Sequence, residues 1–175
     1  MKQTVIIDMV NGFCKHGALA DPKIMKIVPN ILEEVENTDI TFVRDTHHED
    51  DAEFRVFPKH CIEDTEEAEI IDELKHLANY CNTFKKTTTN GMWEWEISNN
   101  FITHDDVVVM GCCTDICVLS FAIALRTFKN KNNLNGDVII KKSCVATYDA
   151  PNHNAKEYND MAFKLMEVQG IKVVE

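Results

Sequence analysis

Short, continuous runs of apolar residues, many of them Val and Ile, recur along the chain and constrain its fold more than any other feature. The run "VVVMG" at 107–111 shows no alternation of apolar and polar residues, which is typical of strands covered on both faces. Stretches with helical spacing separate these runs, and such an alternation predicts a parallel sheet. We therefore predict an α/β fold with three layers, in which helices cover both faces of a mostly parallel six-stranded sheet.

The apolar pattern also predicts where each element lies. The predicted strands are Thr4–Asp8, Ile40–Asp45, Thr83–Lys86, Val107–Gly111, Val138–Lys142 and Ile171–Val174. The predicted helices are Ile24–Glu36, Glu66–Leu77, Trp93–Asn99, Cys117–Lys129 and His153–Gln169. No internal repeat or linker interrupts this order, so we expect one domain over residues 1–175.

Charge and composition exclude several classes of function. The net charge of −11 disfavours nucleic acid and anionic membranes as partners. No apolar run approaches the ~20 residues of a membrane span, and the first residues do not resemble a signal peptide. We therefore expect a cytoplasmic protein that forms a homo-oligomer, either a dimer or a tetramer. The seven cysteines form no CxxC pair, which favours reduced thiols over a disulfide framework.

Polar side chains follow four of the predicted strands. Asp8 ends the first strand, Asp45 the second, and Lys85 and Lys86 the third, while Cys117 lies just beyond the fourth. In parallel sheets ligands bind beyond the carboxyl ends of the strands. Because an acid, a candidate metal ligand, a base and a thiol meet at one edge, we expect a functional site there.

Cys117 is the cysteine that we expect to react. Cys112 and Cys113 follow the strand directly and should be buried. Thr114 or Asp115 is expected to cap the next helix, which places Cys117 in its first turn. Unpaired backbone N–H groups there favour a thiolate. The other four cysteines are expected to fill the core: Cys14, Cys61, Cys81 and Cys144.

Four segments resemble one known family. "GCCTDICV" at 111–118 resembles the nucleophile segment of the isochorismatase-like cysteine hydrolases, a family that includes the nicotinamidases. "VIIDMVNGF", "FKKTTTNGM" and "FPKHCIEDTEEAEI" are similar to its other motifs, in the same order along nearly the whole chain. The resemblance implies a catalytic triad of Cys117, Asp8 and Lys86, with Lys86 favoured over Lys85. It also implies a cis peptide bond between Cys112 and Cys113, and an oxyanion held by the N–H groups of Cys113 and Cys117.

The resemblance further implies a metal and an aromatic pocket. Asp45 and His47 flank one residue, so both side chains can lie on one face of an extended chain. With Glu53 and His60 they would hold one divalent ion, for which Zn is expected before Mn or Fe. Phe13 and Phe57 match pocket residues that stack on a substrate ring. The rest of the acidic loop is expected to be solvated: His48, Glu49, Asp50 and Asp51.

These residues predict an amidohydrolase that cleaves a small carboxamide. The first expectation is hydrolysis of nicotinamide to nicotinate and ammonia through a thioester on Cys117, while the metal orients the substrate. Thr46 and the "NGM" segment depart from the nicotinamidase pattern, so other substrates stay open. The alternatives are an isochorismatase-type or carbamoyl hydrolase with the same triad, and a non-catalytic binding protein with the same fold.

Overall fold

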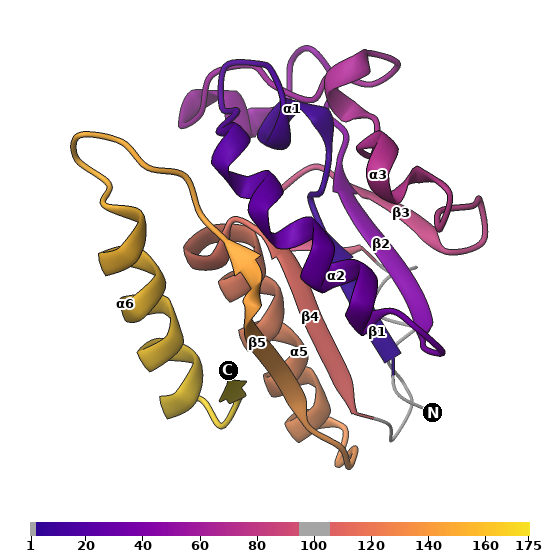
Figure 1. Cartoon of the computed structure of the whole chain (residues 1–175), viewed down its shortest axis with the longest axis vertical. Helices are drawn as coiled ribbons and strands as arrows, with labels where there is room; N and C mark the ends of the chain where they lie inside the picture. Colours follow the sequence, from indigo (N-terminus) through magenta and orange to yellow (C-terminus); the bar gives the residue numbers. More distant parts are fainter. Residues whose placement is uncertain (1–2, 95–105) are drawn as a thin grey trace.

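The computed structural model describes residues 3–94 and 106–175. Its centre is a six-stranded sheet in the order β3-β2-β1-β4-β5-β6, and every pair of neighbouring strands is parallel (Figure 1). The strands are β1 Gln3–Ile7, β2 Asp39–Asp45, β3 Thr83–Lys86, β4 Val107–Cys112, β5 Val138–Ala146 and β6 Lys172–Val174. The predicted three-layer α/β architecture is confirmed.

Helices of very different length connect the strands. The α-helices are α1 Asn11–Cys14, α2 Val28–Glu34, α3 Asp72–Lys75, α5 Leu119–Lys131 and α6 Ala155–Val168. A 3₁₀ helix over Pro22–Ile27 leads into α2, and shorter 3₁₀ turns span Ala52–Arg55, Glu66–Ala68 and Gly91–Trp93. The predicted helix Trp93–Asn99 lies outside the described residues from position 95 onward.

The predicted continuous helix Glu66–Leu77 is wrong. The chain makes one 3₁₀ turn and then runs extended at Glu69 and Ile71 before α3 begins. Backbone hydrogen bonds with the segment after β1 hold it there: Glu69 accepts from the N–H of Asn11 at 2.9 Å, and Ile71 donates to the carbonyl of Met9 at 3.1 Å. These tertiary bonds outweigh the local helical pattern.

Two buried clusters lie on opposite faces of the sheet. Successive side chains of a strand point to opposite faces, so Ile6 packs under α2 and the preceding 3₁₀ helix, whereas Val5 and Ile7 pack under α5 and α6. Figure 1 shows α2 crossing one face of the sheet and α5 lying behind the other. Each such side chain stabilises the fold by about 1.5–3 kcal/mol when fully buried, which explains why the strands are apolar throughout.

The strand order reverses between β1 and β4, at the centre of the sheet. Gly111 allows these two strands to meet closely. Its φ is +112°, and a Cβ atom there would lie 2.0 Å from the carbonyl oxygen of Ile7. As a result Cys112 reaches the end of β1, where its thiol donates to the carbonyl of Asp8 at 3.1 Å. This switch in strand order is where sheets of this kind bind ligands.

A π-helical turn, Thr114–Val118, connects β4 to α5. Cys113 occupies the N-cap position, so the expectation that Thr114 or Asp115 caps the helix is wrong. The carboxylate of Asp115 instead lies 2.8 Å from the imidazole of His153, a partner distant in the sequence. No helix among residues 3–94 and 106–175 has the length and apolar character needed to cross a membrane.

Candidate active site and metal centre

The carboxyl ends of four parallel strands bring four buried functional groups together. Asp45 ends β2 and Lys86 ends β3, where the two are direct register partners. Asp8 follows β1 with a φ of +53°, and its N–H donates to the carbonyl of Val43 at 2.9 Å. Cys117 lies in the turn after β4. All four side chains are at most 6% exposed, so solvent scarcely screens their charges.

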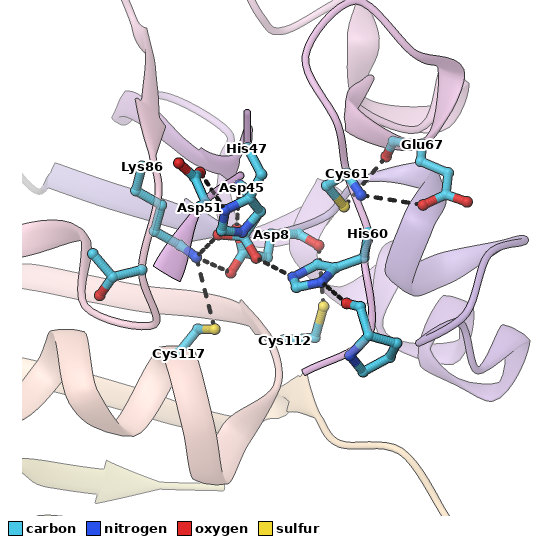
Figure 2. Close-up of polar contacts among 12 residues, drawn as sticks. Asp8, Asp45, His47, Asp51, His60, Cys61, Glu67, Lys86, Cys112 and Cys117 are labelled. Atoms are coloured by element: carbon cyan, nitrogen blue, oxygen red, sulfur yellow. Dashed lines mark hydrogen bonds and ion pairs between the residues drawn. The ribbon is translucent and has the colours of Figure 1, made fainter. Parts of the chain in front are cut away.

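The ammonium group of Lys86 is the centre of this cluster (Figure 2). Its Nζ lies 2.9 Å from Oδ2 of Asp8 and 3.8 Å from Sγ of Cys117, and it also donates to Oδ1 of Asp45. Lys85 points the other way because side chains alternate along β3. Its Nζ is exposed and pairs with Glu63. The structure therefore places Lys86, and not Lys85, beside the thiol.

Burial and charge set the protonation of the three groups. Burial raises the pKa of Asp8 to about 6, although the positive charge of Lys86 opposes the shift. Burial also raises the pKa of the Cys117 thiol well above its usual value, against the same opposing charge. Burial lowers the pKa of Lys86, but Asp45 and Asp8 outweigh it and the net shift is upward. The resting site therefore holds a thiol and an ammonium group, and not the thiolate expected from the helix position.

Asp45, His47 and His60 form a compact cluster beside Lys86. One candidate ligand atom from each lies within 4.8 Å of the others. Nε2 of His60 is 3.3 Å from Oδ2 of Asp45, and Nε2 of His47 is 3.7 Å from Oδ1. Nε2 of His47 is buried and has no hydrogen-bond partner in the part of the chain that the structure describes. Two imidazole nitrogens and a carboxylate fit a divalent ion such as Zn, Mn or Fe, so these residues suit the expected metal.

The segment that carries His60 is attached directly to the end of β2. His47 donates its backbone N–H to the carbonyl of Cys61 at 2.9 Å, and Glu63 donates to the carbonyl of His47 at 2.8 Å. Nδ1 of His60 lies 2.8 Å from the carbonyl of Pro58, which leaves Nε2 directed at Asp45. These hydrogen bonds explain how His47 and His60, 13 positions apart in the sequence, become neighbours.

Asp51 is a site residue that the sequence did not reveal. Its Oδ2 lies 2.9 Å from Nδ1 of His47 and accepts the N–H of His48 at 3.0 Å, so its placement in a solvated loop is wrong. A carboxylate on the second ring nitrogen fixes the tautomer and orientation of a ligating imidazole. The signal available in the sequence was the carboxylate four residues after His47. Glu53 lies nearby but outside the compact cluster, and burial, followed by the charge of Asp45, raises its pKa.

A cavity of about 510 Å³ opens onto Cys117. Phe13 and Phe57 both line it, and their rings lie 5.4 and 6.4 Å from the ring of His60 between centroids. Phe54, which the sequence did not single out, lies 5.0 Å from the ring of His47. A small ligand fits a cavity of this size. Its wall also includes Asp45, Glu53, His60, Cys113, Ile116 and Tyr148.

The remaining cysteines divide into buried and exposed. None of the seven cysteines, all within the described residues, forms a disulfide bond, and Cys14, Cys61, Cys112, Cys113 and Cys144 are buried as expected. Cys81 is exposed, so its assignment to the core is wrong. Cys81 lies in an exposed turn between α3 and β3. The peptide bond between Cys112 and Cys113 is cis.

The model of one protein family matches nearly the entire chain. This model describes the isochorismatase domain, and it matches residues 2–174. The chain belongs to the isochorismatase family. Nicotinamidase 1 of Arabidopsis thaliana is 34% identical in an alignment of 177 positions, which covers 87% of this chain and 72% of that protein. This member of the family is therefore an amide-cleaving hydrolase of the nicotinamidase-like branch.

Solved structures of family members superpose over the whole chain. A nicotinamidase from Bacillus subtilis is 29% identical with a TM-score of 0.75, and the match covers 99% of both chains. N-carbamoylsarcosine amidase from Thermoplasma acidophilum is 27% identical with a TM-score of 0.71, and the match covers 99% of this chain and 95% of that one. Both relatives are named as amidases, and their substrates differ.

Proposed function

We propose that this family member is a nicotinamidase, which hydrolyses nicotinamide to nicotinate and ammonia through a thioester on Cys117. The observation that carries the proposal is the buried contact of the Lys86 ammonium group with both Asp8 and Cys117, of which Cys117 lines the cavity. The similarity to Nicotinamidase 1 and to the B. subtilis nicotinamidase supports this choice of substrate.

The first half of the reaction forms the thioester. The Asp8 carboxylate takes the proton of Cys117, and the positive charge of Lys86 stabilises the thiolate that results. The thiolate attacks the carboxamide carbon, and the carbonyl oxygen becomes an oxyanion. Backbone N–H groups of Cys113 and Cys117 stabilise the oxyanion, and each such donor typically increases the rate ~10²–10³-fold. The C–N bond then breaks, and Asp8 returns the proton to the departing ammonia.

The second half releases the acid. Asp8 takes a proton from a water molecule, whose oxygen attacks the thioester carbon. The C–S bond breaks, the acyl group leaves as nicotinate, and the proton on Asp8 restores the thiol. Phe13 and Phe57 hold the ring by stacking. A divalent ion held by Asp45, His47 and His60, with Glu53 in reach of the same cavity, would act as a template for the ring nitrogen.

Ammonia release from nicotinamide tests the proposal. We expect wild-type protein to release ammonia, Cys117→Ala to lose the activity, and Cys81→Ala to keep it because Cys81 is exposed and precedes β3, whose far end carries Lys86. Trapping of an acyl group on Cys117, detected by peptide mass spectrometry, would support the thioester. Equal and slow release from nicotinamide by wild type and Cys117→Ala would contradict the proposal.

A second candidate substrate is an N-carbamoyl compound, which the similarity to N-carbamoylsarcosine amidase favours. The same nucleophile would attack the carbamoyl carbon, and ammonia would again leave. Parallel assays with nicotinamide, pyrazinamide and an N-carbamoyl amino acid distinguish the two functions. We expect the highest kcat/KM for nicotinamide, and a preference for the carbamoyl compound would assign the second function.

A further inference from the structure

His153 is a buried histidine that the proposed mechanism does not use. Its ring is stacked between two tyrosines: the centroid of Tyr148 lies 3.8 Å away at an interplanar angle of 9°, and that of Tyr158 lies 3.7 Å away at 28°. Reciprocal backbone hydrogen bonds with Ala150, of 3.0 and 2.9 Å, hold the loop that carries it in front of α6. The histidine therefore has one defined orientation.

The two ring nitrogens of His153 face oxygens from two different parts of the site. Nε2 lies 2.8 Å from Oδ2 of Asp115, in the turn that carries Cys117. Nδ1 lies 3.0 Å from the backbone carbonyl of Tyr148, whose side chain lines the cavity. The ring therefore bridges the turn that carries Cys117 and the segment that lines the cavity.

Asp115 depends on this contact. Its side chain is 7% exposed, and its second carboxylate oxygen, Oδ1, is buried with no hydrogen-bond partner among the described residues. A buried carboxylate without a compensating donor is strongly unfavourable. Loss of the His153 contact would therefore drive Asp115 towards water and shift the π-helical turn with it.

The turn transmits such a shift to the nucleophile. Asp115 and Cys117 are two residues apart within it, and the carbonyl of Cys113 accepts the N–H groups of both Ile116 and Val118 at 3.1 Å. The sulfur of Cys117 must stay near Nζ of Lys86, now 3.8 Å away, for the ammonium group to stabilise a thiolate. A displacement of about 1 Å in such a geometry costs about 10²-fold in rate.

We propose that His153 is a positioning residue, which holds the Cys117 turn through Asp115 and the cavity wall through Tyr148. His153 does not line the cavity itself, so it acts through these two neighbours and does not touch the substrate. The expected changes in kcat and KM rest on the proposed amidase function. The expected effect of His153 on the reactivity of the Cys117 thiol does not rest on it, because that reactivity can be measured without any substrate.

Two conservative variants separate the two contacts. The amide nitrogen of Gln reaches the position of Nε2, so His153→Gln keeps a donor to Asp115. The amide nitrogen of Asn reaches the position of Nδ1, so His153→Asn keeps a donor to Tyr148. We expect His153→Gln to raise KM with kcat within about twofold of wild type, and His153→Asn to lower kcat by about 10²-fold with little change in KM. The matched control is His76→Asn, at an exposed histidine, which should change neither.

The reactivity of Cys117 provides a readout independent of the substrate. We expect iodoacetamide to alkylate Cys117 more slowly in His153→Asn than in wild type, and at the wild-type rate in His153→Gln. Peptide mass spectrometry follows each site, and the exposed Cys81 is the internal reference. This pattern in a protein that releases no ammonia from nicotinamide would reject the proposed function and retain the positioning role. Variants that lower only the melting temperature, with kcat, KM and alkylation unchanged, would overturn the positioning role.

Discussion

Oδ1 of Asp8 accepts a hydrogen bond of 2.8 Å from the backbone N–H of Asp45, so the proposed catalytic base and the proposed metal ligand are joined directly. Lys86 forms ion pairs with both carboxylates. Two buried carboxylates that share one ammonium group leave an excess negative charge, which a divalent cation at Asp45 would compensate. The candidate metal centre and the candidate triad are therefore one electrostatic unit.

Replacement of Lys86 should affect both stability and activity. Lys86→Met leaves Asp8 and Asp45 buried without their cation, and breaking such a pair costs about 3–5 kcal/mol of the free energy of unfolding. Lys85→Met removes only an exposed pair with Glu63, whose charges water screens, so the free energy of unfolding should scarcely change. Urea unfolding and ammonia release measure the two effects. A larger loss of activity in Lys85→Met than in Lys86→Met would assign the wrong lysine to the site.

Asp51 should control metal affinity without being a ligand in the compact cluster. Asp51→Asn removes the carboxylate that lies 2.9 Å from Nδ1 of His47, and loss of such a partner typically weakens metal binding about 10–100-fold. Asp50→Asn is the matched control because Asp50 is exposed in the same loop. Isothermal titration calorimetry with Zn²⁺ measures the metal affinity of each variant. Equal affinities for the two variants would mean that Asp51 does not orient His47 towards a metal.

The activity should fall as the solution becomes acidic. Asp8 must be ionised to take the thiol proton, and burial raises its pKa from 3.8 to about 6. We therefore expect kcat/KM to fall about tenfold for each pH unit below about 6. The pKa of Asp8 is higher in the folded state than in the unfolded state, so protonation of Asp8 stabilises the fold. Unfolding driven by Asp8 therefore does not explain the loss of activity at low pH. Circular dichroism at each pH checks that the protein stays folded. If kcat/KM begins to fall only near pH 4, the group that titrates is not Asp8 with its raised pKa.

Gly111 should tolerate no side chain. Gly111→Ala combines an unfavourable φ of +112° with a Cβ atom 2.0 Å from the carbonyl oxygen of Ile7, so β1 and β4 would have to separate. We expect it to cost at least about 3 kcal/mol in the free energy of unfolding. Gly170→Ala has a φ of +79° but nothing within 4 Å, and should cost about 1 kcal/mol. Similar unfolding midpoints in urea for the two variants would contradict the close approach.

Patterns of residue type are enough to predict the sheet and the polar residues at its edge. Apolar runs without alternation predict strands covered on both faces, and the carboxyl ends of parallel strands lie at one edge. This grouped Asp8, Asp45 and Cys117 with a lysine at 85 or 86, and the family spacing favoured Lys86. The family motifs added His60, which the spacing alone would not have placed beside Asp45.

Contacts between distant segments, and the protonation of the buried groups, follow from the folded arrangement of the chain. Asp115 contacts His153 across 38 residues, and the segment around Ile71 is extended because it bonds to residues after β1. Cys117 rests as a thiol because its burial outweighs the charge of Lys86. Hydrogen bonds and desolvation depend on which groups meet in three dimensions and how much water they lose there. A local pattern of residue types shows neither which distant groups will meet nor how much water they will lose.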